Sequence, residues 1–427
     1  IRREGPSGLG GALQRILFIN QLFWQMGHRL MGLGRLDMLL HPFYEKDIRD
    51  GSLTKEEALS LIREFLETLH RFYWLKSNVL MGDTGQIIIL GGMKDKEHYF
   101  WNDLTKLFIE AVLQLKLPDP KILLRVSVHM PRTLMEQALR CIATGVGSPL
   151  LSNDDVVVSR LQEYGVEEQD AYDYGTSACW EPLIQGKSAS LNNLTYLSYP
   201  RVFKNTLEQT QGCFLREPEG FMKAFYGQLR TEIKRVCLSI SDFRFQYNPL
   251  LSVFISDCFE NKRDVSFGGA RYSNYGITTV GLSNAVNAIL NIRELVHKKG
   301  RYTISQIRKF MDDNFEGQDE LVYRLKNMGA YFGKDDGEVL QLTNEILQVT
   351  SQYTEGYRNY MGGRLKFGAS APSYIDAAKD FPATFDGRKK GEPFGVHISS
   401  ERNQGYTEIV NFASSIDYGG NRFNHIS

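Results

Sequence analysis

The sequence predicts an α/β protein, because strand-like and helix-like segments alternate in its first third. The apolar run of residues 86–90 is typical of a strand that is buried on both faces. A helix of residues 103–117, a strand of residues 122–128 and a helix of residues 132–143 are predicted to follow it. Strands that alternate with helices in this way indicate a parallel sheet.

The composition is typical of a globular protein with a large core, since 42% of the 427 residues are hydrophobic and 23% are charged. The charges of the 50 basic and 50 acidic residues cancel, so the formal net charge is zero. No apolar run approaches the roughly 18 residues of a membrane span. We therefore expect neither nucleic acid nor a membrane as a partner. Five scattered cysteines and eight dispersed histidines predict a cytoplasmic location and no metal site.

The N-terminal segment is predicted to be helical, with apolar residues from Leu13 to Phe23 at helical spacing. Residues 27–37 are rich in glycine, but no strand leads into them and their order is not Gly-x-Gly-x-x-Gly, so we reject a phosphate-binding loop. A capping box formed by Thr54 and Glu57 opens a further helix. The apolar stripe of that helix predicts packing and not a cofactor site.

The second half is predicted to be mainly helical. Residues 218–239 show an amphipathic pattern that puts Cys237 in the core, and residues 282–297 show another. Residues 386–394 resemble a solvated charged loop by composition, and residues 405–413 are predicted to be a late strand with its entry turn. Because no internal repeat or linker is visible, residues 1–427 are predicted to form a single domain.

One loop around Cys179 carries the predicted chemistry. Pro182 forces Glu181 away from the helical region, and residues two apart in an extended segment point to the same side. The Cys179 thiol and the Glu181 carboxylate are therefore predicted to face one space. A neighbouring negative charge raises the pKa of a thiol. This argues against a thiolate nucleophile and favours hydrogen-atom transfer by the sulfur with proton transfer by the carboxylate.

Five separated blocks resemble the glycyl radical enzymes, the pyruvate formate-lyase-like superfamily. Residues 178–182, Ala-Cys-Trp-Glu-Pro, resemble the Gly-Cys-Val-Glu-Pro loop of many members. Residues 34–44 resemble a Gly-Arg-x-Asp stretch followed by Pro-x-Tyr, and residues 147–154 resemble a Gly-x-Pro…Asn-Asp turn. Residues 268–272 and 386–394 resemble the Gly-Gly-Ala-x-Tyr and Asp-Gly-Arg-x-x-Gly-Glu-Pro segments. The blocks follow the family's order, and the loop of residues 178–182 resembles its dehydratase, C–N lyase and decarboxylase branch more than its acyltransferase branch.

The resemblance implies a ten-stranded α/β barrel of two five-stranded halves, with the Cys179 loop as a central finger. It implies that Cys179 forms a thiyl radical that abstracts a substrate hydrogen, and that Glu181 is the general base. The expected reaction is C–O, C–N or C–C cleavage of a small polar molecule, with His28 as a candidate substrate-binding residue. The expected partners are a radical-SAM activating enzyme, which installs a protein glycyl radical, and a second copy in a homodimer. No bound cofactor is expected.

Three other functions are weighed against this one. Acyl transfer of the formate acetyltransferase type is the first, but pyruvate formate-lyase has two adjacent cysteines, whereas Ala178 and Trp180 flank Cys179. A non-catalytic barrel or scaffold paralogue is the second, and the intact Cys179 and Glu181 argue against it. A thiolate hydrolase is the third, and it lacks a Cys–His pair that can be recognised in the sequence.

The glycine that carries the radical is expected to lie outside this sequence. Family members carry it in an Arg-Val-x-Gly-Tyr-type loop far downstream of the Asp-Gly-Arg block. Residues 402–406 imitate that loop, but Asn403 and Gln404 replace the expected small or apolar residues, so Gly405 is not assigned. The sequence is therefore expected to be incomplete at both ends and not to be activated by itself. Trp180 is expected to pack behind the Cys179 loop and to brace it.

Overall fold

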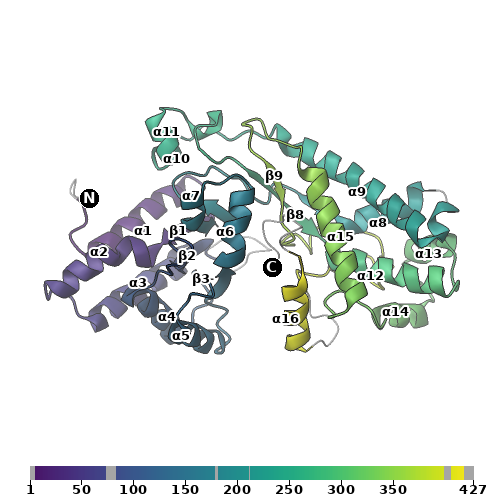
Figure 1. Cartoon of the computed structure of the whole chain (residues 1–427), viewed down its shortest axis with the longest axis horizontal. Coiled ribbons are helices and arrows are strands. Elements are labelled where there is room, and N and C mark those ends of the chain that lie inside the picture. The colour runs from purple at the N-terminus through teal and green to yellow at the C-terminus, as the bar shows by residue number, and fades with distance from the viewer. Residues whose placement is uncertain (1–4, 74–82, 178–180, 211, 399–404, 418–427) are drawn as a thin grey trace. The chain divides into compact units, whose positions relative to one another are not determined.

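The computed structural model describes residues 5–73, 83–177, 181–210, 212–398 and 405–417. Its contacts divide the chain into two compact units, residues 1–186 and residues 187–427, each with its own hydrophobic core (Figure 1). The described residues combine parallel sheets with helices, so the predicted α/β class is confirmed. No helix within these ranges is long and apolar enough to cross a membrane.

The first unit is built on a parallel four-stranded sheet in the order β1-β2-β3-β4. A separate antiparallel pair, β5-β6, ends the unit. The strands are β1 (Met31–Arg35), β2 (Gln86–Gly91), β3 (Lys121–Val126), β4 (Leu150–Asn153), β5 (Tyr174–Ser177) and β6 (Glu181–Ile184). The helices are α1 (Leu9–Gln25), α2 (Leu36–Arg49), α3 (Lys55–Phe72), α4 (Asp103–Leu115), α5 (Arg132–Ile142), α6 (Asp154–Glu163) and α7 (Glu168–Tyr172).

Strand β2 is buried on both faces, as the sequence predicts. Ile88 and Leu90 belong to the core that the sheet shares with helices α1 to α5. Ile87 and Ile89 point to the opposite face, where they pack with Leu123 of β3. The predicted capping box of α3 is confirmed as well, because the Thr54 side chain and the Glu57 backbone and side chain bond reciprocally.

Strand β1 lies in the glycine-rich segment in which the sequence analysis found no strand. It pairs in parallel with β2 from Met31 to Arg35. Gly32 is required there by a close approach of two backbones, because a Cβ at this position would lie 2.0 Å from the carbonyl oxygen of Thr176. A glycine that weakens the strand pattern in the sequence therefore lets β5 lie against β1.

The second unit contains a parallel three-stranded sheet in the order β7-β8-β9. Its strands are β7 (Tyr196–Ser198), β8 (Tyr275–Val280) and β9 (Leu365–Phe367). Its α-helices are α8 (Tyr199–Gln209), α9 (Pro218–Ser241), α10 (Pro249–Val253), α11 (Ser256–Glu260), α12 (Leu282–Ile292), α13 (Ile304–Asp312), α14 (Asp319–Lys326), α15 (Gly337–Thr354) and α16 (Tyr406–Ser415). Two 3₁₀ turns, η1 (Phe214–Arg216) and η2 (Val265–Phe267), and one π-helical turn, η3 (Arg293–Lys298), complete it.

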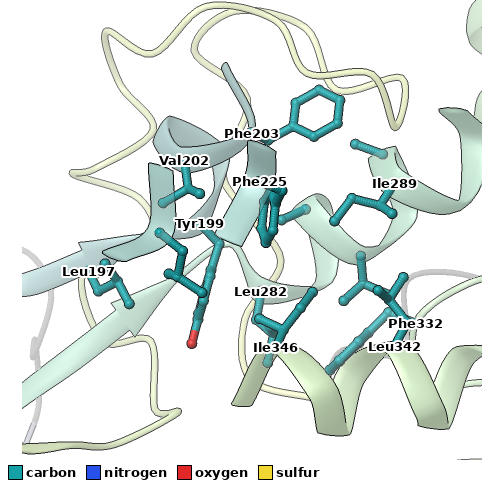
Figure 2. Packing of buried hydrophobic residues seen from close by; sticks show 14 of the residues in the cluster. Leu197, Tyr199, Val202, Phe203, Phe225, Leu282, Ile289, Phe332, Leu342 and Ile346 are labelled. Atoms are coloured by element: carbon teal, nitrogen blue, oxygen red, sulfur yellow. The ribbon is translucent and has the colours of Figure 1, made fainter. Parts of the chain in front are cut away.

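The core of the second unit forms where α8, α9, α12 and α15 meet the sheet. Leu197, Phe225 and Ile346 come from three of these elements and pack in one cluster (Figure 2). Cys237 of α9 is buried in the same cluster, which confirms its predicted structural place. The helices predicted at residues 218–239 and 282–297 are observed as α9 and as α12 with its π-helical extension η3.

Two predictions for the C-terminal segment are wrong. Residues 405–413 are not a strand, because Tyr406–Ser415 form helix α16, with Phe412 buried against Phe332. The apolar residues that suggested a strand fit a helix with one buried face equally well. Residues 386–394 are not a solvated loop either, because Asp386 and Arg388 are buried. Their charges are compensated by hydrogen bonds, which composition does not reveal.

Candidate active site

The predicted catalytic loop joins the two strands of an antiparallel hairpin. Strand β5 ends at Ser177 and β6 begins at Glu181, and these two residues pair with each other. Cys179 and Trp180 fall between them and lie outside the described residues. The predicted direction of the Cys179 thiol and the predicted packing of Trp180 therefore stay predictions.

Glu181 is the predicted site residue that the structure describes best. It is extended, as Pro182 requires, because it is the first residue of β6. It is only 6% exposed. A carboxylate that is nearly removed from water at the start of a hairpin strand is strongly constrained, because burial of a charge is costly unless other groups compensate it. Such a position suits a group that must accept a proton in a fixed place.

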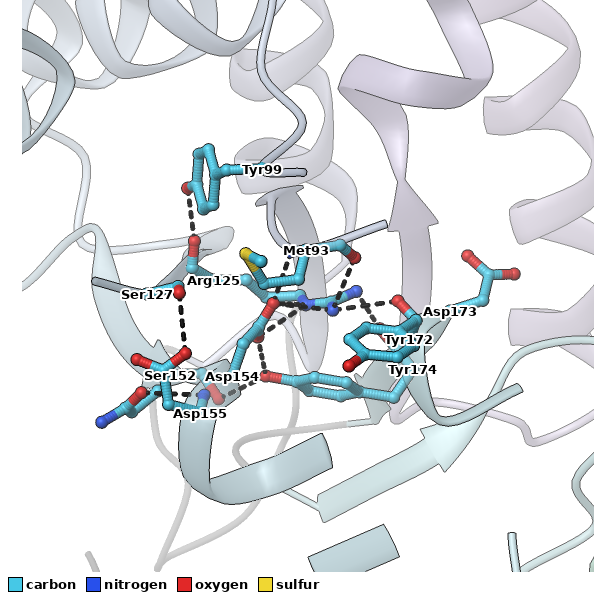
Figure 3. A network of polar contacts seen from close by, with 12 residues as sticks. Met93, Tyr99, Arg125, Ser127, Ser152, Asp154, Asp155, Tyr172, Asp173 and Tyr174 are labelled. Carbon is cyan, nitrogen blue, oxygen red and sulfur yellow. Dashed lines mark hydrogen bonds and ion pairs between the residues drawn. The ribbon is translucent and has the colours of Figure 1, made fainter. Parts of the chain in front are cut away.

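A buried ion pair lies at the base of this hairpin (Figure 3). Arg125 of β3 and Asp154 of α6 are both fully buried, with side-chain exposures of 0%. The Arg125 Nε donates to Asp154 Oδ1 at 2.9 Å, and its Nη2 donates to Asp154 Oδ2 at 2.8 Å. This two-point geometry fixes the plane of the guanidinium as well as its position.

The same guanidinium holds the hairpin by its backbone. Arg125 Nη1 donates to the carbonyl oxygen of Tyr174 at 3.0 Å, and Nη2 donates to that of Tyr172 at 2.9 Å. The Tyr174 ring lies under the guanidinium with its centroid 4.0 Å away, and its hydroxyl donates to Asp154 Oδ1 at 2.8 Å. Both the backbone and the side chain of the first β5 residue are thus tied to one ion pair (Figure 3).

Burial and charge oppose each other in this network. Burial alone lowers the pKa of Arg125, but the Asp154 carboxylate brings the pKa of Arg125 above its ordinary value. Burial, together with the same carboxylate, raises the pKa of Tyr174 far above 10. The guanidinium therefore stays charged and the phenol stays neutral through the physiological range, so the hydrogen-bond pattern does not change with pH there.

Two further residues complete the support of the hairpin. Arg35 of β1 donates to the carbonyl oxygen of Gly91 at 3.0 Å and forms an ion pair with Asp173 at 3.3 Å. Gly92 leaves room for Arg125, because a Cβ at that position, where φ is +109°, would lie 2.5 Å from the Arg125 Nε. The segments around residues 35, 92 and 125 therefore all contribute to holding residues 172–174, where the hairpin begins.

His28 lies at the turn after α1, before strand β1. It is half-buried, and its ring meets Phe23 edge to face with centroids 5.7 Å apart. Burial lowers its pKa below the ordinary value, so the ring is neutral at pH 7. Two residues further on, the carbonyl oxygen of Leu30 accepts a hydrogen bond from Ser177 Oγ at 3.3 Å. The segment that follows His28 is thus hydrogen-bonded to the last residue of β5. A substrate-binding role for His28 stays a prediction.

Three of the other four cysteines are poorly suited to act as nucleophiles. Cys141, Cys237 and Cys258 are buried, and burial raises the pKa of each, to about 12 for Cys237. Cys213 is exposed. Within the described ranges, no three His, Cys, Asp or Glu side chains are grouped closely enough to hold a metal ion.

Arg125 is not among the site residues predicted from the sequence, and Asp154 is predicted only as part of a family-like turn. One signal was present: Arg125 is the one charged residue in the run Ile-Leu-Leu-Arg-Val, which otherwise predicts a buried strand. A charge inside such a strand needs a buried partner. The sequence could not indicate which carboxylate that partner is, because Asp154 lies 29 residues away.

Comparison with known proteins identifies the family. A family model described as pyruvate formate lyase-like matches residues 1–374. The chain is 24% identical to (2S)-3-sulfopropanediol dehydratase of Klebsiella oxytoca, over 97% of this chain and 54% of that protein. It is 25% identical to trans-4-hydroxy-L-proline dehydratase of Clostridioides difficile, over 90% of this chain and 52% of that protein. The chain thus spans about half the length of the curated relatives it matches.

A solved structure shows the same fold. The glycerol-bound form of the B12-independent glycerol dehydratase from Clostridium butyricum superposes with a TM-score of 0.89 at 24% identity, covering 99% of this chain and 57% of that one. The match of the family model over most of the sequence carries the assignment, and the structure agrees with it. The chain belongs to the pyruvate formate lyase-like family of glycyl radical enzymes.

Proposed function

We propose that this chain is the part of a glycyl radical lyase, of the dehydratase type, that carries Cys179 and Glu181. One observation carries the proposal: Glu181 is buried at the start of β6, opposite Ser177, so that Cys179 belongs to the short connection of a hairpin. A thiol and a carboxylate so close in the chain suit paired hydrogen-atom and proton transfer. The curated relatives named above are both dehydratases, which favours C–O cleavage.

The proposed reaction balances in three steps. The Cys179 sulfur, as a thiyl radical, takes a hydrogen atom from a substrate carbon that bears a hydroxyl group. Glu181 takes the proton of that hydroxyl, and the hydroxyl group on the neighbouring carbon leaves with this proton as water. The resulting carbonyl radical takes a hydrogen atom back from Cys179, so the thiyl radical is restored and the substrate has lost one water molecule.

The proposed substrate is a small molecule with hydroxyl groups. Relatives and structural neighbours are named for a sulfonated propanediol, for hydroxyproline and for glycerol. The sulfonated propanediol and glycerol carry the two adjacent hydroxyl groups that these steps use. In hydroxyproline, the ring amine on the carbon next to the single hydroxyl group would take the place of the hydroxyl that gives its proton to Glu181. His28 is proposed as a substrate-binding residue, since its turn adjoins β5 and a neutral ring can accept or donate a hydrogen bond.

The remaining predictions belong to the same proposal. The whole chain is proposed to form one ten-stranded barrel of two five-stranded halves, with the β5-β6 hairpin as its central finger. Such enclosure would shield a reactive radical from water. A radical-SAM enzyme is proposed to install the glycyl radical, and the enzyme is proposed to act as a cytoplasmic homodimer. Acyl transfer of the formate acetyltransferase type is not favoured, because both curated relatives named above are dehydratases.

The test is a pair of substitutions in the full protein, activated anaerobically and supplied with (2S)-3-sulfopropanediol, trans-4-hydroxy-L-proline, glycerol and 1,2-propanediol. Glu181→Gln keeps the shape of the side chain and removes the base, so we expect turnover to fall by about 10²–10⁴-fold with the fold retained. Cys179→Ala should abolish turnover. Product formation by chromatography measures both.

Glu232→Gln is the matched control. Glu232 of α9 is 5% exposed, close to the 6% of Glu181, and it forms an ion pair with Arg235. This substitution removes an equally buried carboxylate, but it should leave turnover within about twofold of wild type. Turnover that survives Glu181→Gln, or that Glu232→Gln reduces as strongly, would eliminate the general-base role.

A further inference from the structure

We infer that Arg125 is a positioning residue for the β5-β6 hairpin, and that it sets where Glu181 lies during the reaction. The inference rests on the proposed function for its catalytic consequence. Its structural part stands on the ion pair with Asp154 and on the bonds to Tyr172 and Tyr174.

Arg125 reaches the hairpin across a long stretch of sequence. Its partners Asp154, Tyr172 and Tyr174 lie 29, 47 and 49 positions away. The bonds therefore join the central strand β3 of the first unit to α6 and to the start of the hairpin. A rigid sheet is a better reference point for a reactive group than a loop is.

The hairpin is short enough to transmit this position. Strand β5 has four residues, and its pairing with β6 extends from Tyr174–Ile184 to Ser177–Glu181. At roughly 3.3 Å per residue, the ladder from the Arg125 bonds to Glu181 spans about 10 Å. Since backbone pairing connects every residue of that ladder, a shift of Tyr174 moves Glu181 with it.

The chemistry of the guanidinium explains why an arginine is needed. It presents donors in a planar fork, so one side chain can bind both oxygens of Asp154 and two backbone carbonyl oxygens at once. A lysine has a single ammonium group at the end of a flexible stem and cannot reproduce that geometry. Arg125→Lys therefore keeps the charge next to Asp154 and loses the fixed direction of the bonds to Tyr172 and Tyr174.

The experiment compares Arg125→Lys with Arg388→Lys in the full protein. Arg388 is a buried arginine of the second unit that also donates to backbone carbonyls, at 2.9 Å to Lys389 and 2.6 Å to Glu392. Three quantities are measured: the melting temperature, the hydrogen–deuterium exchange of the peptide over residues 170–188, and kcat and KM on the substrate that gives turnover.

We expect both substitutions to lower the melting temperature. Only Arg125→Lys should speed amide exchange in β5 and β6, and only Arg125→Lys should lower kcat, by about 100-fold, with KM within about twofold, because a displacement of about 1 Å costs that much in a positioned reaction. A purely structural role would lower stability without this split between kcat and KM.

Wild-type exchange and wild-type kcat in folded Arg125→Lys would overturn the inference, and so would equal effects from Arg388→Lys. If Arg125→Lys does not fold, Tyr174→Phe replaces it, because this change removes the hydroxyl with its bonds to Asp154 and Ser152 and leaves the ring in place. It should produce a smaller change in the same two readouts, and no change would overturn the inference. Exchange does not depend on catalysis, so a failure of the Glu181 test alone would contradict the proposed function and leave the positioning result intact.

Discussion

Arg125 in the first unit and Arg388 in the second are both buried and both donate to backbone carbonyl oxygens, but they differ in the partners that balance their charge. Arg125 forms a two-point ion pair with Asp154. Within the part of the chain that the structure describes, no ion pair joins Arg388 to a carboxylate. Asp386 accepts instead from Asn284 at 2.6 Å and from Thr384 and the Arg388 backbone.

The pKa values follow this difference. Burial lowers the pKa of Arg388, and the charges of Asp386 and Glu392 only partly offset it. The pKa of Arg125 is raised despite complete burial, because of the Asp154 carboxylate. The two arginines also differ in how far along the sequence their partners lie. Arg388 donates to carbonyl oxygens at most seven residues away, whereas Arg125 donates to carbonyl oxygens up to 49 residues away. Arg388 shapes its own loop, and Arg125 ties distant elements to the candidate active site.

The largest expected effect is that of Arg125→Met on stability. Removal of the guanidinium leaves the Asp154 carboxylate buried at 0% exposure without its cation. Breaking a buried ion pair on one side costs about 3–5 kcal/mol. Urea unfolding of the full protein measures this free energy. A loss below about 1 kcal/mol would contradict the view that the pair is a tightly coupled unit.

Arg388→Met is expected to cost less. Its loss removes the side-chain donor from the carbonyl oxygens of Glu392, Phe381 and Pro382. The carbonyl oxygen of Lys389 also loses this donor but keeps the bond from the Glu392 backbone N–H. However, Asp386 keeps its bonds to Asn284 and Thr384. The residues that carry these carbonyl oxygens are only half-buried, so water can replace the lost donor at most of them, and we expect a total cost of about 1–3 kcal/mol, equivalent to one unsatisfied buried group. The same urea titration measures the loss of unfolding free energy in both variants. A larger loss in Arg388→Met than in Arg125→Met would contradict the proposed difference between the two arginines.

Lys366 is a third buried cation, and its expected effect depends on pH. It lies on β9 between Leu365 and Phe367, which face the core, so its side chain leaves the opposite face of the sheet. Burial, with a smaller effect of the Arg364 charge, lowers the pKa of Lys366 to about 7. The unfolded chain binds this proton up to its ordinary pKa near 10.5, so between about pH 7 and pH 10.5 the unfolded state holds more protons than the folded state.

Stability should therefore rise with pH in this window, by up to about 1.4 kcal/mol per pH unit from this group. Below about pH 7 both states are protonated and the slope from Lys366 disappears. Other groups titrate in the same range, so the measured quantity is the difference in urea unfolding free energy between wild type and Lys366→Met. A difference that stays constant from pH 7 to pH 9 would contradict the lowered pKa.

Tyr174→Phe is the smallest of the predicted changes. It removes the hydroxyl that donates to Asp154 at 2.8 Å and meets Ser152 at 2.9 Å, and it keeps the ring under Arg125. One hydrogen bond to a charged group is worth about 1.5–3 kcal/mol, less the relief of burying a polar group. We expect a net loss of about 1 kcal/mol by thermal unfolding. A stabilised variant would show that the hydroxyl is not needed to hold Asp154.

The sequence predicted those elements that local pattern determines. Strand β2 and helices α4 and α5 follow from uninterrupted apolar runs or stripes, and the extended state of Glu181 follows from Pro182. Strand β1 was missed because the glycine at position 32 is required by a close contact with Thr176, 144 positions further along the chain. The residues next to Gly32 in the sequence do not indicate this contact. Helix α16 was taken for a strand because a short apolar run does not distinguish the two.

The candidate site was predictable only in part. The Cys179–Glu181 spacing is readable in the sequence because it is local. The support from Arg125 was not readable, because its partners are set by how β3, α6 and β5 pack in three dimensions. The burial of Asp386 and Arg388 could not be predicted from composition for the same reason. A charged segment has the same composition whether water or backbone carbonyl groups surround its side chains.

The most direct measurement of the central claim is isotope exchange in the activated Glu181→Gln variant. The full protein is incubated in D₂O with the substrate that wild type converts, and the recovered substrate is analysed by mass spectrometry. The Cys179 thiol exchanges its hydrogen with solvent, so hydrogen abstraction and return should place deuterium on the substrate carbon although no product forms. Cys179→Ala should give neither deuterium nor product. Product from Glu181→Gln, or deuterium in the substrate of Cys179→Ala, would contradict the division of hydrogen-atom and proton transfer between these two residues.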